Sequence, residues 1–197
     1  SGMIAAVDTC PVSHLAASCG SDGMVHVWDY VQRQGVCSRG FDSSATSLRW
    51  APRHMDAQGR TLVVGFSNGM VRILSLGRSE TKGAAPSISM KTCVKVHNGS
   101  VKSLDFTSNG NFLASSGEEG FVWIMDSSKL AKDGTLSPIR FFLPRPTSQE
   151  EAELTGNLAS ATCEKLAWAE SEHDILCTCS DGSLVLANVT SLVEGVF

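Results

Sequence analysis

Aliphatic residues recur at alternate positions in four short stretches of this chain. Each stretch follows a turn that ends in glycine, and its aliphatic residues stand two and four positions after that glycine. Side chains two residues apart lie on the same face of a strand, so each stretch predicts a strand with one buried face. The glycines and their aliphatic pairs are Gly23 with Val25 and Val27, Gly69 with Val71 and Ile73, Gly120 with Val122 and Ile124, and Gly182 with Leu184 and Leu186.

Two further strands are predicted upstream of each glycine. The nearer strand is rich in small residues and covers 15–18, 62–65, 113–116 and 176–179 in the four repeats. The farther strand carries an aliphatic anchor, followed two residues later by an aromatic residue in three repeats. Because the aromatic residue recurs, we expect it to pack in the core rather than to stack on a ligand. The anchors are Val7, Leu48, Leu104 and Leu166, and the aromatic residues are Trp50, Phe106 and Trp168.

The spacing from anchor to glycine supports this alignment. It is 16 residues in the first, third and fourth repeats and 21 in the second, where an insertion lies around residues 52–59. A weaker fourth strand is predicted near 36–41, 91–96 and 139–143. The stretches 77–89, 127–138 and 144–162 are predicted to be loops, with a short helical turn as an alternative for 150–158.

Four-stranded antiparallel units that repeat in this way are typical of a β-propeller, where each unit is one blade. We therefore expect an all-β chain with four blades, at residues 2–43, 44–96, 97–161 and 162–197. A propeller protects its strand edges by closing into a ring of about 4–8 blades. Four blades of a seven- or eight-blade ring would leave two open edges. We therefore expect this chain to be part of a larger ring, completed by sequence outside it or by a partner.

The turns and strand ends resemble those of the WD40-repeat family. The best match runs from Asp22-Gly23 to Trp28-Asp29, and His97 begins another matching repeat. The resemblance implies that such residues are structural markers, whose hydrogen bonds hold each blade together. No repeat has the complete set, because Glu119 and Met125 replace the expected Asp and Trp in the third. We therefore expect stability to depend on apolar packing between blades. The full set of markers is Asp22, Gly23, Trp28, Asp29, Gly69, His97, Gly120, Asp181 and Gly182.

A finer resemblance lies in residues 4–11, 47–52 and 62–66. These segments are similar to the WD-repeat region of the cilia- and flagella-associated protein 44 type, large scaffolds of the axoneme. The resemblance implies a non-catalytic protein-interaction scaffold that helps to tether dynein-associated complexes. It also implies a cytoplasmic, cytoskeletal location in the cilium or flagellum, with dynein-tether or microtubule-associated proteins as partners. The alternative is a peptide-reader or adaptor propeller of a cytosolic or nuclear complex.

Composition narrows the classes of partner and compartment. The chain has 197 residues, is 42% hydrophobic and carries a net charge of −4, which fits a folded core and argues against disorder. No basic face predicts nucleic-acid binding, and no apolar run approaches the ~20 residues that cross a membrane. We also find no signal peptide. Seven scattered cysteines, an odd number, favour free thiols in a cytosolic-type compartment over a disulfide framework.

The sequence lacks the common patterns of catalytic residues, which favours a chain that is not an enzyme. None of the five histidines forms a zinc-protease pattern, and neither a nucleophile elbow nor a phosphate-binding glycine loop is present. The sequence therefore predicts neither a catalytic site nor a cofactor. A propeller that hydrolyses a substrate is a less favoured rival. Cys177 and Cys179 share a strand face and could support a metal, but buried small hydrophobic residues are the simpler interpretation.

Partners of a propeller usually bind where the first strand of each blade begins. Aligning the repeats brings six polar residues of mixed charge to this rim, and we treat them as possible protein-binding residues. Trp123 is a further candidate, because it points away from the Val122/Ile124 face and would be either exposed or between blades. His26 also points away from the buried face and is expected to be solvated. The six rim residues are Ser44, Thr46, Ser100, Lys102, Thr162 and Glu164.

Overall fold

The computed structural model describes residues 2–77, 86–119, 121–127, 138–142 and 161–190. Within these residues, fifteen strands form four antiparallel sheets, which follow one another along the chain. We call the sheets blades 1 to 4. The marker Gly120, most of the two longer predicted loops and the predicted helical turn lie outside the described residues.

Each blade pairs its strands in chain order. Blade 1 contains β1 (Ile4–Thr9), β2 (Leu15–Gly20), β3 (Met24–Asp29) and β4 (Gln34–Gly40). Blade 2 contains β5 (Ala45–Trp50), β6 (Thr61–Phe66), β7 (Met70–Gly77) and β8 (Ser87–Lys95). Blade 3 contains β9 (Val101–Phe106), β10 (Phe112–Gly117), β11 (Phe121–Asp126) and β12 (Pro138–Phe142). Blade 4 contains β13 (Cys163–Trp168), β14 (Asp174–Cys179) and β15 (Leu184–Asn188).

The weak fourth strands lie where the sequence predicts them, as β4, β8 and β12. The predicted loop at 77–89 is too long, however, because β7 extends to Gly77 and β8 already begins at Ser87. Gly77 and Ser87 are cross-strand partners, and Ile88 is buried in the core between blades 1 and 2. The apolar burial of Ile88 explains why strand pairing continues into this serine-rich segment.

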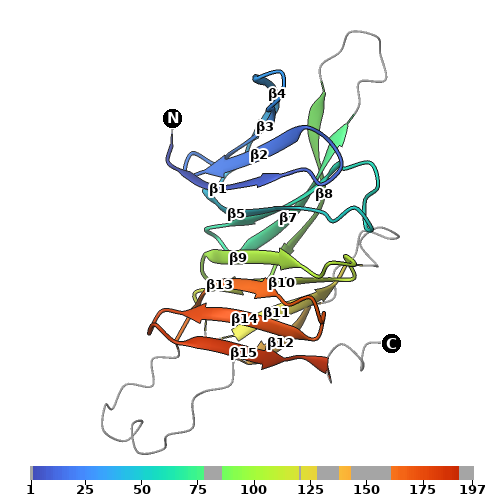
Figure 1. The fold of residues 1–197 in the computed structure, drawn as a ribbon. Coiled ribbons are helices and arrows are strands. Elements are labelled where there is room, and N and C mark those ends of the chain that lie inside the picture. Colours follow the sequence, from blue (N-terminus) through green and yellow to red (C-terminus); the bar gives the residue numbers. More distant parts are fainter. Residues whose placement is uncertain (1, 78–85, 120, 128–137, 143–160, 191–197) are drawn as a thin grey trace, which may run out of the picture.

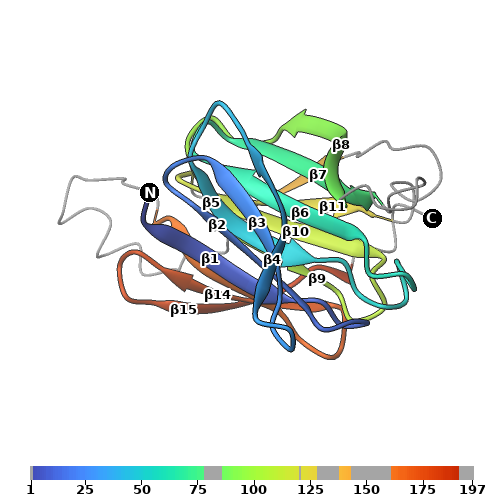
Figure 2. The same ribbon diagram turned by 90° about the horizontal axis from the view of Figure 1, so that it is seen from above.

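The blades stack face to face in the order 1, 2, 3, 4, and apolar side chains fill each interface (Figure 1). Val25 and Val27 pack against blade 2, while Val71 and Ile73 pack against blade 3. The strands β1, β5, β9 and β13 lie next to one another, and the other strands of each blade extend away from them (Figure 2). We call these four the inner strands.

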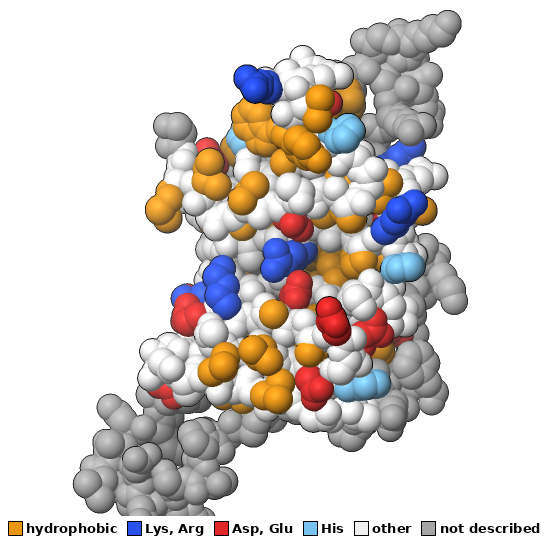
Figure 3. All heavy atoms as spheres, viewed as in Figure 1, with side chains coloured by type: hydrophobic (Ala, Val, Ile, Leu, Met, Phe, Trp, Pro, Cys, Tyr) orange, Lys and Arg blue, Asp and Glu red, His pale blue; other side chains and the backbone are white. Residues whose placement is uncertain are grey.

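The two ends of the stack leave apolar faces uncovered. Leu184 and Leu186 occupy the repeat positions that pack on the following blade elsewhere, yet they are 65% and 62% exposed. At the other end, Val7 and Trp28 of blade 1 are exposed. In blades 2 and 3, the equivalent face is buried against the preceding blade. Hydrophobic side chains gather near both ends of the stack in Figure 3, with charged groups between them. The chain is thus an all-β arc of blades of a larger propeller.

Candidate functional site

The six predicted rim residues lie at one edge of the stack, beside the turns between the second and third strands. There they mainly contact the neighbouring blade. Ser44 donates a hydrogen bond to the backbone oxygen of Ser21, at 2.9 Å. Thr46 donates to the backbone oxygens of Val101 (2.6 Å) and Gly65 (3.1 Å). These side chains therefore link blade 1 to blade 2 and blade 2 to blade 3.

The charged part of the rim links blades 3 and 4. The Nζ of Lys102 lies 3.3 Å from a Glu164 carboxylate oxygen, and the other oxygen of Glu164 accepts a hydrogen bond from Thr162 at 3.0 Å. The Thr162 hydrogen bond, followed by Lys102, lowers the pKa of Glu164. Ser100 is half-buried just before β9. A solvent-exposed ion pair contributes about 1 kcal/mol or less to the free energy of unfolding. The rim is thus mainly a set of polar contacts between blades, none of which is strongly stabilising alone.

A second polar network, which the sequence analysis missed, joins the inner strands. The carboxylate of Asp8 accepts a hydrogen bond from the backbone N–H of Trp50 in blade 2, at 2.7 Å. Asp105 accepts one from the backbone N–H of Trp168 in blade 4, at 2.9 Å, and pairs with Arg49 at 3.2 Å. Burial raises the pKa of Asp105, although these partners oppose it. The sequence signal for this network is an Asp that directly follows the aliphatic anchor in repeats 1 and 3.

Trp123 lies apart from the rim. It is half-buried in the middle of β11, where it packs against the apolar core between blades 2 and 3. Its ring meets Phe121 edge-to-face, with centroids 5.7 Å apart. Trp123 thus lies half-buried beside the interface between blades 2 and 3, and a role for it in binding a partner stays a prediction. The recurrent Trp50 and Phe106 are buried, as expected, and Trp168 is half-buried against the core.

His97 forms the most complete polar cluster of any blade marker. It is buried, with its Nδ1 2.8 Å from a Glu119 carboxylate oxygen and its Nε2 3.0 Å from the Ser115 hydroxyl. This order matches a Ser–His–acid triad, but Ser115 is completely buried and no substrate could reach it. The cluster instead fixes the turn of blade 3. The structure thus adds a buried polar network in blade 3 to the apolar packing between blades that the sequence predicts.

The markers of blade 1 take part in related contacts. The indole N–H of Trp28 donates to the Ser18 hydroxyl at 3.0 Å, and the His26 ring lies beside it with centroids 5.7 Å apart. His26 is thus half-buried against Trp28 rather than fully solvated. Asp29 accepts hydrogen bonds from the backbone N–H groups of Val31 and Gln32, at 3.0 and 2.8 Å. These contacts order the β3–β4 turn.

The turn markers have the backbone geometry that their glycines predict. Gly23, Gly69 and Gly182 have φ values of 72°, 78° and 83°, which non-glycine residues rarely adopt. Asp22 accepts a hydrogen bond from the N–H of Met24 at 3.1 Å, and Asp181 accepts one from Ser183 at 2.9 Å. The turns are therefore formed by local hydrogen bonds.

All seven cysteines are free thiols. Cys177 and Cys179 are both buried in the core between blades 3 and 4. A hydrogen bond with Cys163, together with burial, raises the pKa of the Cys177 thiol. The described part of the chain contains no group of three or more His, Cys, Asp or Glu side chains that could hold a metal ion. No helix in the described residues is long and apolar enough to cross a membrane.

Comparisons with known proteins agree with this geometry. The family model "WD domain, G-beta repeat" matches residues 1–29 and 89–126. Cilia- and flagella-associated protein 44 of Mus musculus is 29% identical over 94% of the chain, and cilia- and flagella-associated protein 43 of Chlamydomonas reinhardtii is 27% identical over 70%. The chain spans only 10% and 8% of these relatives. The crystal structure of Saccharomyces cerevisiae Sqt1 is 14% identical with a TM-score of 0.65, covering 94% of this chain and 46% of that one.

Proposed function

Because this chain is built of WD40-repeat propeller blades similar to those of cilia- and flagella-associated protein 44, we propose that it is a non-catalytic protein-interaction scaffold of the axoneme. Its work there is to tether dynein-associated complexes within the cytoskeleton of the cilium or flagellum. The similarity to the mouse relative over 94% of the chain carries this proposal. The division into blades at 2–43, 44–96, 97–161 and 162–197 is part of the same proposal.

The geometry of the polar groups supports a scaffold rather than an enzyme. The one Ser–His–acid arrangement described above is sealed inside blade 3, and the rim groups are engaged with neighbouring blades. Blades held rigidly in this way offer several edges and connecting turns on which other proteins can assemble. A scaffold requires such surfaces and no reacting group.

Location in a ciliated cell tests the proposal. We expect the full-length protein, carrying a fluorescent tag, to concentrate along the axoneme and to remain there after detergent extraction. Proximity labelling from the tag should then enrich dynein-associated or microtubule-associated proteins over a tagged cytosolic control. A uniform cytosolic signal would exclude the axonemal role, and axonemal enrichment without dynein-associated neighbours would exclude the tethering role.

A further inference from the structure

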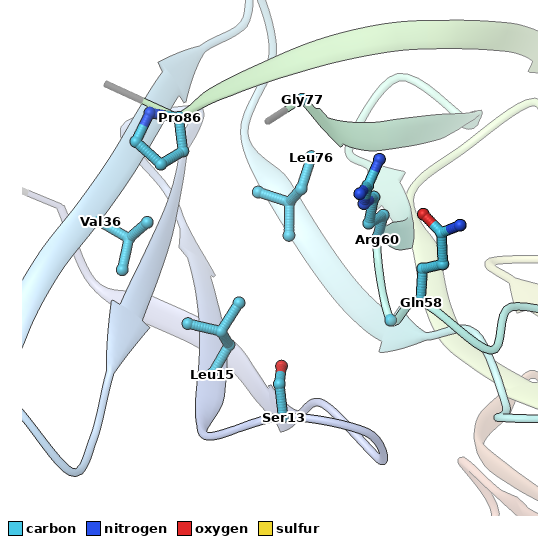
Figure 4. A pocket seen from close by; sticks show the side chains of 9 residues that line it. Ser13, Leu15, Val36, Gln58, Arg60, Leu76, Gly77 and Pro86 are labelled. Carbon is cyan, nitrogen blue, oxygen red and sulfur yellow. The ribbon is translucent and has the colours of Figure 1, made fainter. Parts of the chain in front are cut away.

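A pocket of about 380 Å³ lies between blades 1 and 2, at the edge opposite the rim. Leu15, Val36 and Leu76 form its apolar side, and Ser13, Gln58 and Arg60 supply polar side chains (Figure 4). The volume lies in the range of ligand pockets, towards its lower end. We call this feature the inter-blade pocket.

The insertion in the second repeat builds one wall of the inter-blade pocket. The connections β1–β2, β9–β10 and β13–β14 each contain five residues, whereas β5–β6 contains ten, at 51–60. Gln58 and Arg60 both belong to this longer connection. The other described blades therefore have no equivalent wall, because their shorter connections end before such a segment could form.

The wall is held in place by its own carboxylate and by blade 1. Asp56 accepts hydrogen bonds from the backbone N–H groups of Gln58, Arg60 and Thr61, at 2.9, 2.7 and 2.7 Å. Gly59 has a φ of 61° and packs so closely on Cys10 that a side chain would not fit there. A preformed wall reduces the entropy that a ligand must lose when it binds.

The charge of the inter-blade pocket is not neutralised within the described residues. Arg60 forms none of the ion pairs found in the described part of the chain. The carboxylate of Asp56, on the same connection, already accepts three backbone hydrogen bonds. Within the described residues, Arg60 therefore leaves a positive charge without a carboxylate partner at the inter-blade pocket. A ligand with a carboxylate would complement it.

Apolar side chains continue from the pocket across blade 1. Val12, next to the pocket residue Ser13, is exposed, as are Tyr30 and Val31 on the β3–β4 turn. The Tyr30 ring meets the His14 ring edge-to-face at 5.8 Å, which places that turn beside the β1–β2 turn. An extended surface of this kind fits a polypeptide better than a small metabolite, and tyrosine is a frequent anchor at protein interfaces.

We propose that the inter-blade pocket binds an acidic, aliphatic segment of a partner protein. A leucine or isoleucine side chain of that segment packs on Leu15, Val36 and Leu76, and a neighbouring carboxylate pairs with Arg60. The proposal rests on the scaffold function proposed above, for which it names the chemistry of one partner. Leu76 is deeply buried while Leu15 and Val36 are half-buried, so the segment completes an existing core rather than opening it.

Fluorescence anisotropy with the full chain and three labelled decapeptides tests the proposal. The first peptide alternates Glu and Leu, the second replaces each Glu by Lys, and the third replaces each Leu by Ser. We expect the Glu/Leu peptide to bind at least about tenfold more tightly than the other two, because both the charge and the apolar contact are required. Equal affinities for the three peptides, or no binding at millimolar concentration, would overturn the proposal.

Variants of Arg60 assign the binding to the pocket. Arg60→Gln should weaken binding of the Glu/Leu peptide about three- to tenfold, and Arg60→Glu should reverse the preference in favour of the Lys/Leu peptide. Arg53→Gln is the matched control, because Arg53 lies on the same connection but does not line the pocket. Unchanged binding by both Arg60 variants would show that the site lies elsewhere. The scaffold function is tested separately by the localisation of the tagged full-length protein described above, which does not depend on the result with the Arg60 variants.

Discussion

At the scale of single residues, His97 shows how a partial marker set still forms a blade. One ring nitrogen forms a hydrogen bond with Glu119 and the other with Ser115, although Met125 replaces the expected tryptophan. An ionised Glu119 requires a proton on Nδ1, so Nε2 accepts from the serine hydroxyl. The longer Glu side chain thus substitutes for the usual Asp, and an apolar Met125 fills the core position.

The His97 cluster should make stability depend on pH. Burial lowers the pKa of His97 from its usual 6.5, even though Glu119 opposes the shift. Below about pH 6.5 the unfolded chain therefore binds a proton that the folded chain does not, and stability falls as the pH decreases. The pKa of Glu119 is also lowered, through its bonds with Asn98 and His97 against the effect of burial, which adds a further loss below its usual 4.5.

Thermal unfolding of the full chain, followed by circular dichroism across this pH range, measures the effect. His97→Gln should cost about 1–3 kcal/mol at neutral pH, because it leaves buried partners poorly satisfied. It should also flatten the loss of stability between about pH 7 and pH 5.5. His54→Gln, a change at an exposed position, should keep the slope of the unaltered chain. Parallel slopes in the unaltered chain and His97→Gln would contradict the assignment.

At the scale of elements, one arginine connects two blades. Arg72 of β7 is buried over the adjoining rings of Phe66 and Phe41, with its carbon Cζ 4.3 and 5.1 Å from their centroids. It also pairs with Asp42 at 2.6 Å, and both Phe41 and Asp42 belong to the segment between β4 and β5. The arginine thereby fixes the passage of the chain from blade 1 to blade 2.

Substitution of Arg72 tests this connection. Arg72→Lys keeps the charge but loses the planar group that stacks on the rings, so we expect a loss of about 1–2 kcal/mol. Arg72→Ala also loses the packing of the long side chain and should cost about 2–4 kcal/mol. Urea unfolding of the full chain measures both. Arg53→Lys is the control, because Arg53 is exposed on the connection between β5 and β6. Equal stability of the three variants would contradict the role of the stacked guanidinium.

At the scale of the whole molecule, the uncovered end faces determine how the chain behaves alone. The Leu184/Leu186 face of blade 4 corresponds to faces that are buried at each internal interface. Burying one leucine side chain is worth about 1.5–3 kcal/mol. Two such residues, with Leu176 beside them, therefore favour association with a further blade or, in its absence, with another copy of the chain.

We expect the double variant Leu184→Thr, Leu186→Thr to reduce self-association of the chain. Analytical ultracentrifugation should show a shift towards monomer relative to the unaltered chain. Because both leucines are exposed, the free energy of unfolding of the monomer should change by only about 0.5 kcal/mol per site. Val185→Thr is the matched control, since Val185 packs towards blade 3 and its change should reduce stability without reducing association. If the chain without substitutions already sediments as a single monomeric species, the expectation is wrong.

The sequence alone determined the repeat, the strands and the turns of this protein. Alternation of residues such as Val25 and Val27, with glycine at fixed spacing, depends on local geometry and is visible in any one repeat. The same pattern located the burial of Trp50 and Phe106, because core positions recur. It also detected the five-residue insertion of the second repeat, but not what that insertion does.

Only the tertiary structure decided which residues from different blades meet. The hydrogen bond from Trp50 to Asp8 and the stacking of Arg72 on Phe41 join groups that are far apart in the chain and come from different blades or from the segment between them. Trp123 shows the same limit, since its strand face was predictable but the blade that covers it was not. Contacts of this kind depend on how sheets stack, and stacking depends on the summed packing of whole faces rather than on any local pattern.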